Sequence, residues 1–476
     1  MRFPGFIGPT YKLRSPNVDC QRCINLYPEL DETHMAKEGE IGALVGTPGL
    51  KLLATLGDGP IRGVWYTSNG KLYVVSGSTL YKVASDWTHT TIGTLQTSTG
   101  QVSMADNGAQ LVVVDGPNGY WVKLSDETFT QIDDDEWLGS NRVTYQDGYF
   151  IFVKPDSQQF YLSDLNDITF SDPANTNAEG APDNIVGHIS VHRNLWLLGE
   201  NTTEIFYNSG DSVNPFQRID GSFMEYGCAA KFSIAKMANS LFWLGRDASG
   251  QGMVVLANGY APQRISTHAV EQAIQKYSDI SDAVAFTYQE NGHHFYVLSF
   301  PTGDATWVYD TATNLWHERA YLKQGGLKRH RANCHAFAYG KHVVGDYENG
   351  KLYEMSLDNL SDAGAEIARI RVLPHLSKSM KRIFYNSFQL DIESGTGIDG
   401  TGQGTDPQVM LQWSDDGGHT WKNEHWRGFG KIGQTRRRCI WRQLGSARDR
   451  VFRVKITDPV KVTMIGAELE FKLGTS

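Results

Sequence analysis

The stretch Asn-Gly-Lys-Leu-Tyr-Val-Val-Ser-Gly-Ser-Thr-Leu-Tyr-Lys-Val, residues 69–83, carries the pattern on which the fold prediction rests. Apolar and polar residues alternate over two short runs, which is the period of a strand buried on one face. Gly77 and Ser78 separate the runs, and glycine at such a point favours a tight turn. The stretch therefore predicts a β-hairpin.

Similar hairpins recur along the middle of the chain. We expect them at residues 110–114 with 120–124, 149–153 with 159–162, 194–198 with 204–207, 240–244 with 252–257, 293–300 with 305–309, and 340–344 with 351–355. Copies spaced by roughly 40–50 residues are typical of propeller blades of four strands each. Because a hairpin cannot bury its own apolar face, the repeats favour a β-propeller of about seven blades. The alternative is a pair of β-sandwiches whose hairpins look alike.

One segment departs from the strand pattern. Val270, Ala273, Ile274 and Tyr277 form an apolar stripe at helical spacing, and Thr267 precedes them as an N-cap residue. We therefore expect one short helix within the propeller.

The last hundred residues predict a separate antiparallel β domain, with strands at 382–393, 408–413, 451–455 and 461–472. The loop 395–406 contains a GxGxxG sequence. Phosphate binding by that sequence needs a helix directly after it, and here a strand follows, so we interpret it as a hairpin loop. We expect an all-β chain with an N-terminal extended segment (1–54), a β-propeller (55–365) and a C-terminal β-sandwich-like domain (366–476).

The composition agrees with this fold and limits the function. The 476 residues include 49 Gly, 12 Trp, 21 Tyr and 21 Phe, which suit tight turns and pleated sheets. No apolar run is long enough to cross a membrane and residues 1–16 do not resemble a signal peptide, so we expect a soluble protein made in the cytosol, without membrane insertion. The net charge of −9 argues against a protein whose main task is gripping DNA phosphates. DNA could still slide past a mildly repulsive wall.

The five cysteines are too few and too scattered for a disulfide framework. Cys20 and Cys23 form a CxxC, but no second CxxC or suitably spaced histidine pair accompanies it. We interpret both as structural thiols, with metal or redox chemistry as the alternative. We expect no cofactor and no catalytic residues, because no nucleophile elbow, P-loop or HExxH sequence is present.

A more specific pattern lies in the C-terminal domain. Residues 414–421, Ser-Asp-Asp-Gly-Gly-His-Thr-Trp, fit the SxDxGxTW "Asp box", a hairpin turn of sialidases and other propellers. We expect Ser414 and Asp416 to bond backbone amides, Gly418 to take a conformation that other residues resist, and Trp421 to enter the core, with Thr420 completing the pattern. The Asp box is a folding device and not a catalytic group. No paired carboxylates for glycoside cleavage stand out beyond acidic turns such as 133–136.

Two basic clusters remain. One contains Lys328, Arg329 and Arg331, and the other is the run 436–438, formed by Arg436, Arg437 and Arg438. They are either solvated charges on loops and strand edges or surfaces that contact DNA or an acidic partner subunit. The sequence leaves both interpretations open.

Several segments resemble the phage packaged-DNA stabilisation proteins, which form the tail nozzle or hub of short-tailed phages. The residues that carry the resemblance at the start and in the middle are 20–29 (CQRCINLYPE), 46–50 (GTPGL), 264–271 (RISTHAVE), 306–310 (TWVYD) and 316–319 (WHER). Near the end, 413–421 (WSDDGGHTW) and 444–452 (LGSARDRVF) resemble related phage tail proteins. Each match is short, but together they spread over most of the chain.

The resemblance implies a ring of six copies beneath the portal and its adaptor ring. Such a ring retains packaged DNA, conducts it out on ejection, and touches it only transiently and without sequence preference. It would also seat tail fibres or tailspikes and a tail needle or plug. We therefore expect a non-enzymatic structural protein of the virion tail, assembled in the host cytoplasm. The alternatives are a virion-associated propeller glycan hydrolase, which would carry further Asp boxes, and a receptor-binding adhesin.

Overall fold

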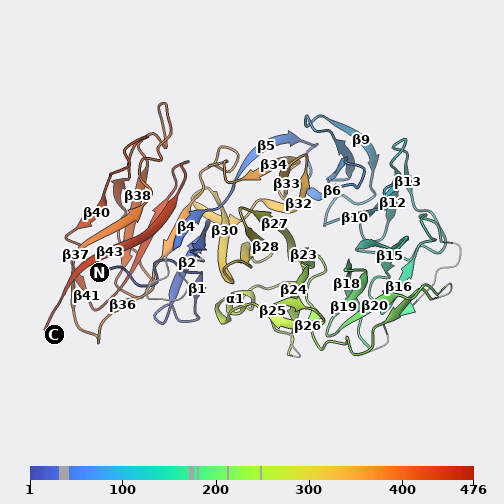
Figure 1. Ribbon diagram of the computed structural model, residues 1–476, viewed down its shortest axis with the longest axis horizontal. Coiled ribbons are helices and arrows are strands. Elements are labelled where there is room, and N and C mark those ends of the chain that lie inside the picture. Colours follow the sequence, from blue (N-terminus) through green and yellow to red (C-terminus); the bar gives the residue numbers. More distant parts are fainter. Residues whose placement is uncertain are drawn as a thin grey trace.

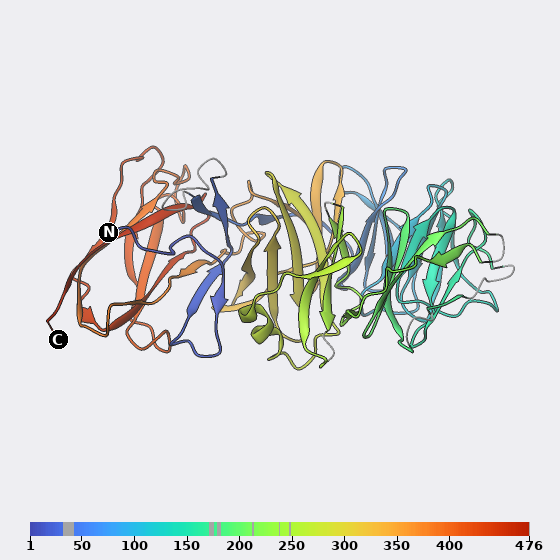
Figure 2. The same ribbon diagram turned by 60° about the horizontal axis from the view of Figure 1, so that its bottom comes forward.

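A computed structural model describes residues 1–31, 42–170, 176–178, 182–211, 214–237, 239–246 and 249–475. These residues form short, mostly antiparallel strands and one short helix, α1 (His268–Ile274), whose N-cap Thr267 accepts a hydrogen bond from Val270 N. Figures 1 and 2 show a ring of sheets beside a smaller layered domain, near which both termini lie. No helix in the described ranges is long and apolar enough to span a membrane.

Among the described residues, seven blades of four or five strands surround an axis, each running outward from its inner position (Figure 1). Blades 1 to 4 are β6 (Ile61–Tyr66), β7 (Leu72–Ser76), β8 (Thr79–Val83) and β9 (His89–Thr94); β10 (Ser103–Asp106), β11 (Gln110–Val114), β12 (Gly119–Lys123) and β13 (Phe129–Gln131); β14 (Val143–Gln146), β15 (Tyr149–Val153), β16 (Gln159–Leu162) and β17 (Thr176–Asn177); β18 (Ile185–Val191), β19 (Asn194–Gly199), β20 (Thr203–Asn208) and β21 (Phe216–Arg218).

Blades 5 to 7 depart slightly from this plan. In blade 5 two short strands share the inner position, and in blade 7 the outer strand comes from the N-terminal part of the chain. Their members are β22 (Gly227–Cys228), β23 (Ala235–Met237), β24 (Ser240–Arg246), β25 (Gly252–Asn258) and β26 (Ala261–Arg264); β27 (Val284–Glu290), β28 (His293–Phe300), β29 (Ala305–Asp310) and β30 (Leu315–Lys323), to which β31 (Gly326–Arg329) pairs; β32 (Ala332–Ala338), β33 (Lys341–Asp346), β34 (Lys351–Ser356) and β5 (Gly49–Thr55).

The seven predicted hairpins are the second and third strands of these blades, so the predicted all-β propeller is confirmed. One detail of the expectation was wrong. The alternation suggested strands with one buried face, yet all five residues of β7 are buried. Each blade packs between two neighbours, so its middle strands are covered on both faces.

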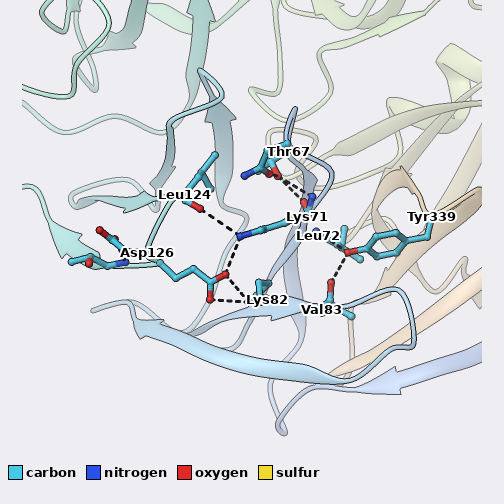
Figure 3. A network of polar contacts seen from close by, with 11 residues as sticks. Thr67, Lys71, Leu72, Lys82, Val83, Leu124, Asp126 and Tyr339 are labelled. Atoms are coloured by element: carbon cyan, nitrogen blue, oxygen red, sulfur yellow. Dashed lines mark hydrogen bonds and ion pairs between the residues drawn. The ribbon is translucent and has the colours of Figure 1, made fainter.

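The ring is closed by a strand and by a polar network. Strand β5 pairs with β34, where Leu50 faces Met355. Figure 3 shows the network: the Tyr339 hydroxyl of blade 7 donates to Val83 O in blade 1 (2.8 Å). Lys71 and Lys82 of blade 1 both pair with Glu127 of blade 2, at 3.1 and 2.6 Å. Blades 7, 1 and 2 are therefore tied together where the circle closes.

The second domain is a β-sandwich built from both ends of the chain. One layer has the order β3-β4-β43-β37-β40, with β41 also paired to β37, and the other continues from blade 6 as β2-β35-β42-β38-β39, with β1 and β36 at its sides. Their bounds are β1 (Tyr11–Lys12), β2 (Cys20–Ile24), β3 (Leu26–Leu30), β4 (Gly42–Gly46), β35 (Arg369–Val372), β36 (Leu376–Ser377), β37 (Ile383–Ile392), β38 (Gln408–Ser414), β39 (His425–Gly428), β40 (Cys439–Arg442), β41 (Ser446–Ala447), β42 (Asp449–Ile456) and β43 (Thr463–Leu473).

The N-terminal residues take part in both domains. Phe3 is 3% exposed and packs edge-on against the rings of Phe388 and Phe452 in the sandwich core. The expected extended segment 1–54 thus supplies strands to the sandwich and, through β5, to the propeller. The division at 54/55 and 365/366 stays a prediction, but the strand pairing makes β1, β2, β3 and β4 part of the sandwich in space.

The two domains share one continuous sheet. Ile24 of β2 pairs with Glu318 of β30 on one side and with Ile370 of β35 on the other. Asn25 follows in a left-handed conformation (φ 52°) and is 2% exposed. Its side chain donates to Ala320 O (2.8 Å) and Ala368 O (3.0 Å) and accepts from Ala320 N (2.9 Å). One buried amide therefore links the propeller to the sandwich.

Candidate functional site

A cavity of about 420 Å³ occupies the centre of the propeller and is lined by residues of the inner strands of all seven blades. A second cavity of about 280 Å³ lies beside it between blades 3, 4 and 5, and the two share Arg142 and His188. Cavities of about 300–1,000 Å³ suit small molecules. This central cavity, called the channel below, is therefore the candidate small-molecule site of the propeller.

The most deeply buried cation of the channel is engaged in holding loops. Arg62 is 1% exposed, and its guanidinium donates to the backbone oxygens of Gly77, Thr97, Thr99 and Gly100 at 2.7–2.9 Å. Burial lowers the pKa of Arg62, and the backbone oxygens replace the water that it has lost. Arg62 thus stabilises the junction of blades 1 and 2.

The channel lacks a pair of carboxylates. Asp106 is the one carboxylate among the described residues that line the central cavity, and it accepts from Trp65 Nε1 (2.8 Å) and Ser68 N (3.1 Å). Burial lowers the pKa of His188 to about 3, so its imidazole is neutral and its Nε2 donates to Ile151 O (2.9 Å). Glycoside hydrolysis usually needs two carboxyl groups about 5–9.5 Å apart, which this cavity does not offer.

The Asp-box residues form a closed turn after β38. Ser414 Oγ donates to Asp416 Oδ1 (2.6 Å) and accepts from Gly418 N (2.8 Å). Asp416 accepts from His419 N (3.1 Å) and Thr420 N (2.9 Å). These bonds, led by those from Ser414 and Thr420, hold the pKa of Asp416 below its usual range. The carboxylate is thus committed to the turn.

The turn also contacts the N-terminal residues. Gly418 has φ +90°, and a Cβ there would lie 3.1 Å from Cys20 Sγ. Trp421 packs against a small cluster that includes Cys20 and Val372, and the Arg453 guanidinium lies 4.2 Å from its ring centre. We expected Trp421 to enter the core. In the structure it is half-buried beside β2.

A Cys–His–Asp cluster went unnoticed in the sequence, because its members are far apart along the chain. Cys20 Sγ lies 3.7 Å from His375 Nε2, and His375 Nδ1 lies 2.7 Å from Asp449 Oδ2. His375 Nε2 also lies 2.8 Å from Pro16 O, which can only accept, so this nitrogen carries a proton. Asp449 and then Cys20 raise the pKa of His375 to about 10. The imidazolium cannot serve as a base for the thiol and instead clamps residues 16–20 to the sandwich.

The CxxC does not bring its two thiols together. Cys20 and Cys23 lie on opposite faces of β2, because they are three residues apart in a strand. Cys20 packs with Val372 and Val451, whereas Cys23 lies in the sandwich core and donates to Leu26 O (3.2 Å). Burial raises the pKa of the Cys23 thiol to about 12, so it is not a thiolate.

The first basic cluster is divided between surface and interior: Lys328 is a surface charge, as one interpretation of the sequence had it, whereas Arg329 and Arg331 pack on aromatic rings. Arg329 is 8% exposed and stacks 3.5 Å from the ring centre of Tyr347. Arg331 stacks 3.9 Å from the ring centre of Tyr321. Arginine suits such sites because its planar guanidinium packs on aromatic faces. Lys328 alone is half-exposed, and it pairs with Asp304 (2.8 Å).

The second basic cluster is exposed. Arg436, Arg437 and Arg438 end the loop between β39 and β40, and all three face solvent. Arg438 donates to Gln389 Oε1 (2.5 Å). The two basic clusters therefore differ in exposure: of the two, the run 436–438 is the one that presents a row of cations to solvent.

Comparisons with known proteins agree with this architecture. Residues 20–359 match the family of the β-propeller of bacteriophage P22 Gp10, and residues 368–472 match that of its β-sandwich. Fold and matches together define a structural protein of a phage tail. The chain belongs to the bacteriophage P22 Gp10 family of phage stabilisation proteins. The resemblance seen in the sequence is therefore confirmed, and membership implies a place in the virion among other virion components.

The remaining comparisons do not bear on the function. No curated protein matches the chain. Similar solved structures include the WD40 β-propeller domain of Doa1, with 14% identity over 65% of this chain and 97% of that chain and a TM-score of 0.41. Another is the N-terminal domain of Nup159, with 11% identity over 70% of this chain and 98% of that chain and a TM-score of 0.40.

Proposed function

We propose that this chain is the ring-forming subunit of a tail nozzle, present in six copies beneath the portal and adaptor ring, where it retains packaged DNA and forms the channel for its ejection. The observation that carries the proposal is that the two family matches follow one another along the chain and cover both domains. The proposal also includes contacts of the ring with tail fibres or tailspikes and with a needle or plug.

The size of the propeller channel supports a path for DNA between subunits. The central cavity of about 420 Å³ is of small-molecule size. A DNA duplex cannot enter it, since its major groove alone is about 12 Å wide. A bore wide enough for the genome must therefore lie between copies of the chain, as in a ring.

The junction between the domains supports a role in transmitting force. A continuous sheet runs from blade 6 through β2 into the sandwich, and the Arg22 guanidinium pairs with Glu318 across it (2.5 Å). Backbone hydrogen bonds and a charge-assisted bond resist hinge motion better than a flexible linker does. Such a subunit transmits force from the capsid side to the tail as one body.

We also propose that the chain has no catalytic activity. The Asp box is committed to its turn, and among the described residues that line the channel Asp106 is the single carboxylate and is already hydrogen-bonded. Incubation with polysaccharide of the host surface should release no sugar above the level of a buffer control. Release that depends on Asp106 would favour the glycan hydrolase instead.

Electron microscopy of intact virions tests the proposed position. We expect a ring of this chain between the portal–adaptor assembly and the tail tip. Antibodies against it should label the collar, whereas label at the fibre tips would favour an adhesin. Finding only monomers, in virions as well as in solution, would refute the ring.

A further inference from the structure

A strongly basic surface lies at the edge of the sandwich farthest from the propeller. Strand β39 ends the layer that continues from blade 6, and β40 ends the other layer. Figure 1 shows β40 at the left of the molecule, with the propeller at the right. We call the "basic edge" the exposed cations of these strands and of the loop between them, Arg427, Lys431, Arg436, Arg437, Arg438 and Arg442.

No described part of the chain neutralises the basic edge. Residues 422–442 contain seven Lys and Arg and one acidic residue, Glu424, whereas the whole chain has a net charge of −9. Glu424 pairs with Lys455 (3.2 Å), which lies outside this run. Among the residues that the structure describes, no carboxylate forms an ion pair with any member of the basic edge. Like charges that remain unpaired at such density repel one another, so the edge favours an incoming polyanion.

Hydrogen bonds hold in place the loops and strands that carry these cations. Gly433 N donates to Gly395 O (3.2 Å) and Ser394 Oγ donates to Thr435 O (2.8 Å), so the two long loops of this end hold each other. Arg427 Nε donates to Ile440 O (3.1 Å), which joins the two edge strands. Binding a partner therefore costs less ordering entropy than it would for a flexible tail.

We propose that the basic edge binds the phosphate backbone of duplex DNA without base specificity. Arginine side chains pair with phosphate in a bidentate manner, and such contacts position a protein on DNA without reading its sequence. The edge has no helix that could enter a groove, which agrees with backbone contacts alone. The choice of DNA among polyanions rests on the proposed function, because the packaged genome is the polyanion that a nozzle meets.

The direct test measures the binding of a short fluorescent DNA duplex of mixed sequence to the full chain. Fluorescence anisotropy at several salt concentrations gives the affinity. The test variant is R436Q/R437Q/R438Q. The matched control is K378Q/K381Q/R382Q, which removes the same charge from exposed positions at the opposite end of β37. A third variant, R436K/R437K/R438K, keeps the charge.

We expect the wild-type affinity to fall with salt. The glutamine variant should bind at least about tenfold more weakly at about 50 mM salt, and its log–log salt slope should be smaller by about 3, one for each lost phosphate contact. The control and the lysine variant should stay within about threefold of the wild type. Unchanged melting temperatures will show that the exposed substitutions leave the fold intact.

Three outcomes would overturn the inference: no binding of DNA by the wild type at low salt, equal losses in the test and control variants, or stronger binding of polyglutamate than of DNA. Electron microscopy of virions that carry the glutamine variant separates this inference from the proposed function. A normal ring together with unchanged DNA binding refutes the basic edge alone. Loss of DNA binding in solution with no ring in wild-type virions refutes the nozzle alone.

Discussion

Replacing Asn25 by alanine should destabilise the junction between propeller and sandwich. The side chain makes three buried hydrogen bonds of 2.8–3.0 Å to the backbone of Ala320 and Ala368. Each is worth about 1 kcal/mol net, and a backbone group left unpaired costs about 1–3 kcal/mol, so their loss should cost about 3–5 kcal/mol. Alanine at φ 52° adds strain of about 1 kcal/mol, because its Cβ disfavours the left-handed conformation.

Glycine at the same position separates these two effects. Asn25→Gly loses the same hydrogen bonds but tolerates the positive φ, so it should be less destabilising than Asn25→Ala by about 1 kcal/mol. Equilibrium unfolding in guanidinium, followed by tryptophan fluorescence, measures both variants. In the wild type both domains should unfold together in one transition, whereas the alanine variant should show two separate transitions, one for each domain. An alanine variant within about 0.5 kcal/mol of the wild type, with its transitions still coupled, would refute the reasoning.

Four further changes have defined outcomes. Leu50→Ala in the closing strand β5 empties a site that is 1% exposed, and should cost about 2–5 kcal/mol in denaturant unfolding; a loss below 1 kcal/mol would argue against closure by β5. His375→Ala should destabilise the sandwich most below pH 6.5. The raised folded-state pKa makes the clamp fully present there and removes it as the pH rises to about 10, so melting curves of variant and wild type should converge. Asp416→Ala should speed hydrogen exchange of the amides at 418–420 without altering the propeller, and unchanged exchange would contradict the role of the turn. Glu127→Gln should cost up to about 1 kcal/mol at low salt and nothing at high salt, since its two lysine pairs are partly solvated; a salt-independent loss would point to packing instead.

The local part of the fold was predictable from the sequence. The hairpin expected at 149–153 and 159–162 coincides with β15 and β16, because alternation and turn residues act within a dozen residues. The helix stripe at Val270 and Ile274 was predictable for the same reason. Closure of the ring was not, since Leu50 pairs with Met355 about 300 residues later and nothing local marks that partner.

The candidate sites divide in the same way. The Asp-box residues are contiguous, so the pattern anticipated bonds such as the one from Thr420 N to Asp416. The burial of Arg329 and Arg331 depends on aromatic rings that other strands supply. A run of basic residues in the sequence does not reveal whether such rings lie beside it. The clamp at His375 needs residues from three distant segments, so only the folded chain shows it.

The interleaving of the two ends of the chain has a consequence for synthesis. The amino group of Met1 donates to Leu469 O (3.0 Å), a partner 468 residues later in the sequence. At about 5–20 residues per second, a ribosome needs on the order of 20–90 s to make that partner available. Until then β4 lacks its partner β43, and its free edge is open to wrong associations. A chain that ends before β43 leaves β4 and the amino group of Met1 without these partners, so its N-terminal residues cannot dock as they do here.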